Sequence, residues 1–472
     1  MDRSTNMTAG HPFRLILAFA FPLILTNIGQ QMYSVVDAII VGRGIGVEAF
    51  AALGATDWCY WLDLWVVQGL AQGFGILAAQ TFGAGDRNAF RRAVAMAVIL
   101  CVVFGTVMTV GFSAGAIPLL RLLNTPKQIF GGAYTYLSTM YLGTLILFAY
   151  NMSAALLRAV GDGKSPLIAM AVAGVLNIVL DIVFVMGFHL GIRGAACASL
   201  LAQLAAFIYC FAIIRRSSVF VLKREDWRPE AAVIKEQCRL GIPMAMQAFI
   251  TVLGGVIAQS VVNSYGYIIV AGCTATNKLH NLMDCSASAV ESADATFVGQ
   301  NYGAGRFDRI KEGLRSSIGI SLAIGTAIML FMFVFGRQVV GLFISSGAEN
   351  AAGVLDVAFR YLFIMAAFLP SAYLMHVYRG SLQGLGNSFA PMVSGGVEFA
   401  ARVGSAVLLT RAIGETGIFF MDGLAWFGAW IFLMVCYYLT FRKASDERFR
   451  EKQGLYESRP EGMNNTMEKG FD

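Results

Sequence analysis

The sequence predicts an all-α integral membrane protein with twelve transmembrane helices in two six-helix lobes, related by a pseudo-two-fold axis along the membrane normal. Three observations predict this class: an apolar composition, a series of long apolar runs and an internal repeat. Of the 472 residues, 57% are hydrophobic and 14% are charged, whereas about a quarter of the residues of a soluble domain are charged. This composition excludes an ordinary soluble globular protein.

The apolar runs are separated by short polar breaks and account for the predicted helices. A helix of about 20 residues crosses a hydrocarbon core of about 30 Å, and a helix satisfies its own backbone hydrogen bonds there. We expect spans at 15–41, 52–81, 93–113, 132–156, 167–188, 194–214, 240–264, 269–299, 316–336, 354–378, 391–410 and 415–441.

The distribution of Lys and Arg predicts the orientation of these spans. If the N-terminus is cytoplasmic, the loops after even-numbered spans and both tails face the cytoplasm, and these segments contain most of the 35 Lys and Arg residues. Cytoplasmic segments of membrane proteins carry such an excess, so we expect both termini in the cytoplasm. The basic residues are spread over many loops, which argues against a nucleic-acid partner.

The second half of the sequence repeats the first. The segment "AAQTFGAG" after the second span recurs as "VGQNYGAG" after the eighth, with Gln80 and Gln300 220 positions apart. "GDGKS" at 161–165 resembles "GLGNS" at 384–388, 223 positions later. Because each copy has an even number of spans, both copies enter the membrane from the same side. We divide the chain into a first lobe, a cytoplasmic linker, a second lobe and a cytoplasmic tail, at 1–214, 215–239, 240–441 and 442–472.

Polar residues inside the spans are the candidates for function, because a charged group there costs about 2.5–3.5 kcal/mol on insertion scales. Asp37 lies in the first span and Asp181 in the fifth, with Asn177 one helical turn before Asp181 and Ser199 in the sixth. Deprotonated, this oxygen-rich group suits a small hard cation such as Na⁺. Alternatively, the two carboxyl groups could exchange a proton as a coupled pair, or only accept hydrogen bonds within a packed bundle.

Four motifs resemble the multidrug and toxic compound extrusion (MATE) family: "VVDAIIVGRG" in the first span, "LLRAVGDGKSP" after the fourth, "GIRGAA" opening the sixth and "GQNYGAG" after the eighth. The resemblance covers about residues 12–441. It implies a V-shaped antiporter of the bacterial cytoplasmic membrane that expels amphipathic, often cationic compounds in exchange for Na⁺ or H⁺. The residues that match the first-lobe cation site of the branch related to DinF are Asp37, Asn177, Asp181 and Ser199, and Tyr136 joins them.

The second lobe departs from this family pattern. Some members carry an essential acid in span seven, where this sequence has a threonine, and span eight instead carries Asp284, Glu291 and Asp294 near one helical face. We place Glu291 and Asp294, with Trp61 and Gln30 of the first lobe, in the substrate cavity, where Glu291 would attract a cation. The alternative is that this face pairs with a lysine of the same span or with polar neighbours.

Two other polar features of the second lobe are interpreted as structural. Glu398 and Arg402 are four residues apart, which predicts an ion pair within one helix. His376 in span ten is interpreted as an ordinary polar contact and not as a proton relay.

These features predict a transporter without enzymatic activity. The glycine runs lack the Lys-Ser/Thr of a P-loop, which argues against ATP-driven transport. We expect no cofactor apart from the coupling ion, Na⁺ or H⁺, and no metal beyond a possible Na⁺ at the first-lobe site. The expected partners are small amphipathic cations and membrane lipids, and the expected state is a monomer. The alternatives are a flippase for a lipid-linked saccharide and a membrane-embedded enzyme or receptor.

Overall fold

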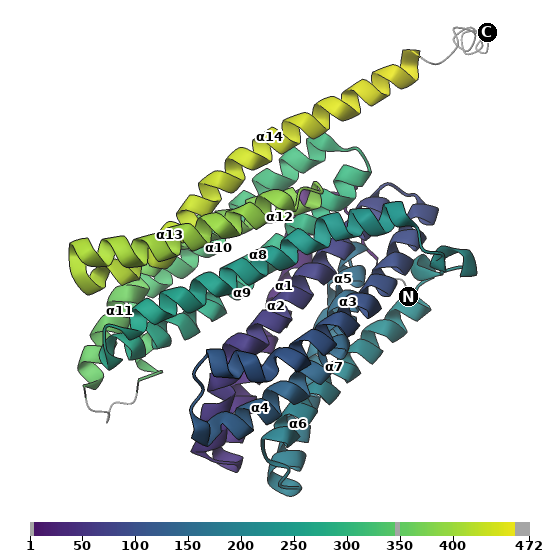
Figure 1. Ribbon diagram of the computed structural model, residues 1–472. Coiled ribbons are helices and arrows are strands. Elements are labelled where there is room, and N and C mark those ends of the chain that lie inside the picture. Colours follow the sequence, from purple (N-terminus) through teal and green to yellow (C-terminus); the bar gives the residue numbers. More distant parts are fainter. Residues whose placement is uncertain (1–3, 345–349, 458–472) are drawn as a thin grey trace, which may run out of the picture.

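The computed structural model describes residues 4–344 and 350–457, and every long element in these ranges is a helix. The first half contains α1 Pro12–Gly44, α2 Val47–Gly83, α3 Arg87–Leu122, α4 Lys127–Leu142, α5 Thr144–Ala159, α6 Lys164–Asp181 and α7 Gly191–Arg216. The second half contains α8 Ala231–Asn263, α9 Tyr267–Gly303, α10 Phe307–Gly341, α11 Ala351–Ala367, α12 Leu369–Gly384, α13 Phe389–Ile413 and α14 Met421–Glu457. Figure 1 shows two bundles that diverge from the end of the molecule marked N.

Twelve spans can be traced through these helices. Length and apolarity alone identify eight stretches among the described residues, or ten if each of two bent helix pairs is one span. One stretch, Phe389–Asp446, contains both α13 and α14, joined by the 3₁₀ turn Gly414–Phe420. The remaining helix, α9, is 37 residues long and is not identified by apolarity because it carries three acids and a lysine. Each predicted span therefore corresponds to one helix or one bent pair.

The backbone repeats in the two halves. The fourth span of each half is bent, by 47° between α4 and α5 and by 48° between α11 and α12. Left-handed residues occupy five corresponding turns: Gly46 and Gly266, Gly85 and Gly305, Asn124 and Asn350, Gly161 and Gly386, and Gly191 and Gly414. The predicted pairing of 161–165 with 384–388 is therefore wrong by two residues. The reason is that Gly384 still belongs to α12, so the turn after this helix begins later than the sequence pattern suggests.

The predicted linker, 215–239, contains the end of α7, two short 3₁₀ turns and the beginning of α8. It is tied to the first half, because Arg91 Nε of α3 lies 3.2 Å from Asp226 Oδ2. The last part of the predicted tail, 458–472, lies outside the described residues.

The two lobes meet at one end through a reciprocal pair of hydrogen bonds. Gln80 Nε2 of α2 donates to the carbonyl oxygen of Gly384 in the second lobe at 2.9 Å. Gln300 Nε2 of α9 donates to the carbonyl oxygen of Ala159 in the first lobe, also at 2.9 Å. The two glutamines occupy the same place in the internal repeat, so the duplicated motif forms both halves of the contact. We call this region the closed end.

Two glycines allow α2 and α9 to approach this closely. A Cβ atom on Gly83 would lie 2.0 Å from the carbonyl oxygen of Gln300, and one on Gly303 would lie 1.8 Å from that of Gln80. Both distances are far below van der Waals contact. Any larger residue at either position therefore forces the two helices apart.

The segment before α1 also crosses between the lobes at the closed end. The Thr5 amide donates to the carbonyl oxygen of Val160 in the first lobe at 2.9 Å. Met7 is buried, its amide donates to Gln300 Oε1 at 2.8 Å, and its carbonyl oxygen accepts from Asn301 Nδ2 at 3.2 Å. This segment is thus bound by both lobes.

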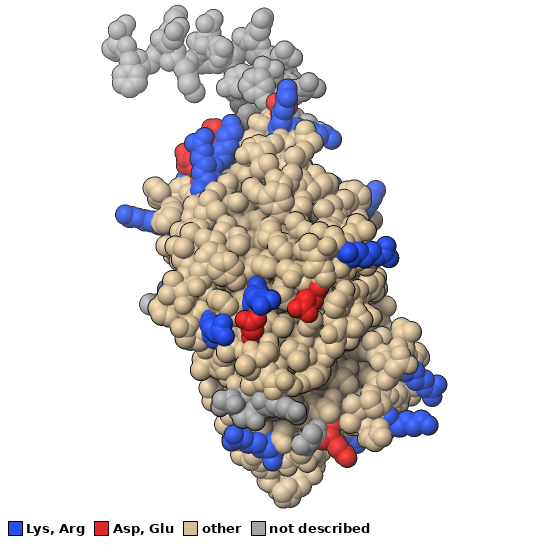
Figure 2. Space-filling model, turned by 90° about the vertical axis from the view of Figure 1, so that its left-hand side faces the viewer, with Lys and Arg blue, Asp and Glu red and all other residues tan. Residues whose placement is uncertain are grey.

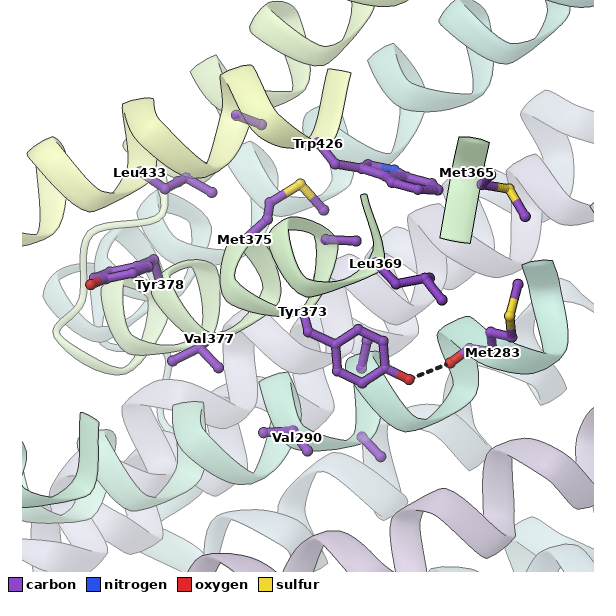
Figure 3. Packing of buried hydrophobic residues seen from close by; sticks show 14 of the residues in the cluster. Met283, Val290, Met365, Leu369, Tyr373, Met375, Val377, Tyr378, Trp426 and Leu433 are labelled. Carbon is purple, nitrogen blue, oxygen red and sulfur yellow. Dashed lines mark hydrogen bonds between the residues drawn. The ribbon is translucent and has the colours of Figure 1, made fainter. Parts of the chain in front are cut away.

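The core of the second lobe holds the bent pair in place. Pro370, at the start of α12, lacks an N–H group and favours a break from α11. Figure 3 shows side chains from α9, α11, α12 and α14 packed together, among them Met283, Met365 and Trp426. Tyr373 Oη donates to the carbonyl oxygen of Met283 at 2.8 Å. These contacts fix the rotation of α12 relative to α9.

The outer surface of the bundle is suited to lipid. Large apolar side chains remain exposed on many helices, for example Val107 and Val175. Figure 2 shows few, separate charged side chains among the uncharged residues of the face drawn. Such a surface would be unfavourable in water and fits hydrocarbon.

The close approach of α2 and α9 gives the first testable prediction. Replacing Gly303 with Ala should destabilise the closed end by about 1–3 kcal/mol, the usual cost of overpacking, and lower the melting temperature of the detergent-solubilised protein. Gly319→Ala is the matched control, because its Cβ would meet no atom within 4 Å and Ala favours a helix. An equal melting temperature for Gly303→Ala and the wild type would contradict the described contact.

Candidate functional site

A cavity of about 660 Å³ lies between the lobes, lined by residues of α1, α2, α5, α8 and α9. Its charged lining residues are Asp57, Arg158, Lys278, Asp284 and Glu291. Most of the other polar lining residues are amides, and three tryptophans supply aromatic surface: Asn27, Gln30, Gln31, Gln68, Gln72, Asn151, Gln259, Asn277, Asn281, Trp58, Trp61 and Trp65. This mixture of aromatic faces, amides and charges can bind amphipathic solutes of varied shape.

Another hollow, of about 840 Å³, lies at the surface over the loop from Lys223 to Pro229. A single loop forms it, whereas both lobes enclose the central cavity. The central cavity is therefore the candidate site for a transported molecule.

A buried polar cluster lies in the first lobe, and the structure brings together the residues predicted for it. Asn177 Nδ2 donates to Ser199 Oγ at 3.3 Å. The side chains of Asp37 and Asp181 are within hydrogen-bonding reach of each other, and Tyr136 is close enough to interact electrostatically with both. All five residues are buried.

The cluster has too few donors for its oxygen atoms. A hydrogen bond between two carboxyl groups needs a proton on one of them. When both aspartates are ionised, Asp37 Oδ1, both carboxylate oxygens of Asp181 and Asn177 Oδ1 have no hydrogen-bond partner in the structure. Because unpartnered buried charges close to each other are unfavourable, this arrangement favours a proton or a cation among the oxygens.

The local structure of α6 contributes to this arrangement. Asp181 is the last residue of α6, and a π-helical turn, Ile182–Gly187, follows it directly. Such turns are frequent at functional sites because they redirect side chains out of the regular helix.

Aromatic side chains link the cluster to the central cavity. The Tyr33 hydroxyl group of α1 lies beside Tyr60 and Gln203, and Tyr60 packs edge-on against Trp61 with ring centroids 6.0 Å apart. Trp61 lines the cavity. Sequence analysis did not select Tyr33, Tyr60 or Gln203, because nothing in the local pattern distinguishes them from core residues.

A second polar cluster lies in the second lobe. His376 of α12 lies between two acids of α9, with Nδ1 2.5 Å from Glu291 Oε2 and Nε2 3.1 Å from Asp284 Oδ1. Gln383 Nε2 donates to Glu291 Oε1 at 3.1 Å, and Gln72 Nε2 of the first lobe donates to Gln383 Oε1 at 2.9 Å. His376 is thus the centre of an acid–imidazole–acid arrangement and more than a single polar contact.

Of the residues predicted for the substrate cavity, Gln30, Trp61 and Glu291 line it. The placement of Asp294 there is corrected by the structure. Asp294 is fully buried, and its carboxylate accepts from Ser317 Oγ at 2.6 Å and from Ser381 Oγ. The spacings of seven and three residues put the three acids near one face of α9. At Glu291 this face borders the cavity, but at Asp294 it packs against α10 and α12.

The predicted ion pair between Glu398 and Arg402 is also corrected. Glu398 pairs with Arg379 of α12, and Arg402 Nε lies 2.8 Å from Asp422 Oδ1 of α14. Each charge therefore pairs with a residue of another helix, because neighbouring helices offer an opposite charge in better geometry than the next turn does. The two pairs join α12, α13 and α14.

Three charged residues of the first lobe were not predicted, and one of them, Asp57 of α2, lines the cavity. Arg158 lines the cavity where it narrows towards the closed end, and it was missed because the fourth span was expected to end at 156 whereas α5 continues to Ala159. Asp63 of α2 is buried, and its carboxylate accepts from Thr144 Oγ1 at 2.8 Å.

The chain matches one protein-family model, MatE, over residues 22–183 and 243–408. It is 30% identical over 424 residues to the probable multidrug resistance protein YpnP of Bacillus subtilis (strain 168), covering 88% of this chain and 92% of that protein. It is 24% identical over 422 residues to the probable multidrug resistance protein NorM of Thermotoga maritima, covering 88% of each.

Solved structures share the fold. A structure described as "Crystal structure of MATE in complex with MaL6" has a TM-score of 0.87 and 21% sequence identity, covering 93% of this chain and 99% of that chain. The likeness extends over both bundles, so the predicted all-α membrane fold of twelve helices in two lobes is confirmed.

The ion pairs of the second lobe give a prediction by double-mutant cycle. Removing one partner of a buried pair costs about 3–5 kcal/mol. Arg402→Gln and Asp422→Asn should therefore be strongly non-additive in their effects on the free energy of unfolding, because the second substitution removes a group already left unpaired. Arg402→Gln and Glu398→Gln should be closer to additive. Stronger coupling of Arg402 to Glu398 than to Asp422 would contradict the described pairs.

Proposed function

Because the chain belongs to the multidrug and toxic compound extrusion (MATE) family of membrane transporters, we propose that it is a secondary active antiporter that exports amphipathic organic cations, drugs among them, in exchange for Na⁺ or H⁺. It is a multi-pass membrane transporter and not an enzyme. We place it in a bacterial cytoplasmic membrane as a monomer, with both termini in the cytoplasm.

The observation that carries this proposal is the set of unpartnered oxygens in the first-lobe cluster. The carboxylates of Asp37 and Asp181, the Asn177 amide oxygen and the Ser199 hydroxyl could form an all-oxygen site for Na⁺. Equally, a single proton shared by the two carboxyl groups would remove most of their repulsion. In both cases, the cluster is less favourable when empty than when occupied, and an ion gradient can drive exchange at such a site.

The arrangement of the lobes supports alternating access. The closed end carries the loops in which most basic residues gather, so on the positive-inside expectation it faces the cytoplasm. The cavity then faces outward, in the state that releases a substrate and accepts an ion from outside. To reach the inward-facing state, the bonds of Gln80 and Gln300 across the lobes must break.

The unit of this movement is the lobe. We propose that 1–214 and 240–441 move largely as rigid bodies about the segment 215–239, as expected for a duplicated transporter. The chain from Thr5 to Thr8, held by Val160 on one side and Gln300 on the other, would lose one set of partners during the change.

The test uses purified protein in proteoliposomes, with efflux of a fluorescent organic cation driven separately by a Na⁺ gradient and by a pH gradient. We expect gradient-driven efflux in the wild type and a loss of at least about tenfold in Asp37→Asn, because a neutral amide cannot balance a cation or exchange a proton. Asp63→Asn is the matched control: Asp63 is also buried, but its partner is a hydroxyl group and not a second carboxyl.

Gel filtration should show the same profile for both variants. Wild-type efflux rates in Asp37→Asn would remove the cluster from the mechanism. If neither gradient drives efflux in the wild type, antiport itself is wrong, and transfer of a labelled lipid-linked saccharide between leaflets is then the activity to measure.

A further inference from the structure

The contacts of His376 require an additional proton in the second lobe. Nδ1 faces Glu291 Oε2 at 2.5 Å, and Nε2 faces Asp284 Oδ1 at 3.1 Å. A neutral imidazole has one N–H group, so it can donate to only one of two ionised carboxylates. The other ring nitrogen would then place its lone pair against a carboxylate oxygen. Both contacts become favourable when the imidazole is doubly protonated or when one carboxyl group carries the proton.

We propose that Asp284, His376 and Glu291 form a second proton site, and that the proton held there competes with the cationic group of a transported molecule for the two carboxylates. This inference rests on the proposed function and assigns part of the cation recognition and proton exchange to the second lobe. The two competing ligands of this site are a proton and an organic cation.

The access to the site fits such competition. Asp284 and Glu291 both line the central cavity, whereas His376 approaches them from α12 and is not part of the cavity lining. The side chain of Asp284 is 39% exposed, whereas those of Glu291 and His376 are 12% and 10% exposed. A cation in the cavity can therefore reach Asp284 most directly, and Glu291 where it lines the cavity.

The surrounding charges leave the site with a net negative balance. The charged or titratable groups that act on the imidazole or on Asp284 are Asp284, Glu291, His280 and Arg379. Lys278, which also lines the cavity, acts on Asp57 of α2. Arg379 is paired with Glu398 of α13, and Arg402 of α13 is paired with Asp422 of α14. The α2 residue that is hydrogen-bonded to this network is the uncharged Gln72, through Gln383. Asp294 of α9 instead accepts hydrogen bonds from hydroxyl groups of α10 and α12. Two carboxylates thus share one imidazolium, a balance that favours binding a cation from the cavity.

The fold does not require this cluster. The bent pair and the helix that faces it exist in both lobes, so each residue of the cluster has a counterpart in the first lobe. The counterparts of Asp284, Glu291 and His376 are Leu64, Ala71 and Asn151. Because the same scaffold forms without an acid–imidazole–acid arrangement, a purely structural role for the arrangement is not needed to explain the packing.

The site is also connected to the other lobe. Glu291 accepts from Gln383, which in turn accepts from Gln72 of α2. A cation that draws the Glu291 carboxylate towards the cavity would weaken a hydrogen-bonded chain between the lobes. A cation bound at the second-lobe site would thereby weaken the contact between α2 and α12.

The test measures binding and not transport. Detergent-solubilised full-length Asp37→Asn, which lacks the first-lobe carboxyl pair, is titrated with tetraphenylphosphonium in weakly buffered solution containing a pH indicator. We expect binding to release protons and to strengthen as the pH rises. In Asp37→Asn/His376→Gln, binding should persist, proton release should disappear and the affinity should depend little on pH.

The matched control is His280→Gln in the same background, because His280 stacks on Trp426 with ring centroids 4.9 Å apart and contacts neither carboxylate through a hydrogen bond in the structure. It should retain proton release. Since His376→Gln could disturb folding, Glu291→Gln provides a second measurement. It should weaken tetraphenylphosphonium about tenfold or more, because one carboxylate charge facing the cation is lost, and leave the binding of a neutral ligand unchanged.

Proton release that persists without His376 would overturn the proposal, as would its absence in Asp37→Asn when the wild type releases protons. Failure of the wild type to bind the cation at any pH would also overturn it. These outcomes are independent of antiport, because a protein that shows no gradient-driven efflux can still exchange a proton for a cation at equilibrium.

Discussion

The reciprocal contact between α2 and α9 is the constraint on which the rest of the structure depends. Each glutamine of the repeated motif reaches across to a backbone carbonyl of the other lobe, and each glycine of the motif removes the side chain that would prevent it. The two lobes are thereby joined at the closed end, and α2 also packs against α8 further along, at Gly73 with Gly241 and at Trp58 with Gly255. The remaining parts of the two lobes leave the central cavity between them.

The duplicated scaffold carries a different polar cluster in each lobe. The first lobe buries two aspartates with an amide and a hydroxyl group, and the second lobe places an imidazole between two acids. Neither cluster is repeated: the position that corresponds to Asp181 is Ala406. The positions of helices and turns are thus common to both halves, whereas the buried ionisable groups differ between them. The residues that determine the fold are therefore different from those that determine the chemistry.

Much of the fold could be predicted from the sequence, because apolar composition and repeat length depend on the chain alone. The grouping of Asp37, Asn177, Asp181 and Ser199 followed from the cost of polar groups in hydrocarbon together with family resemblance. Contacts between helices could not be derived in this way. Glu398 has an arginine one turn away, yet its partner comes from α12, and only the packing of neighbouring helices decides between the two. The same limit applies to His376, whose two partners lie on a different span.

The binding of Met7 has a consequence for the order in which the protein assembles. Its amide is bound by Gln300, 293 positions further along the chain, so the segment before α1 can reach its final place only after α9 has been synthesised and inserted. The first lobe must therefore wait, with the segment before α1 not yet in place, until the first two spans of the second lobe have been made. The closed end is thus completed only when the beginning of the chain binds a residue beyond the midpoint of the sequence.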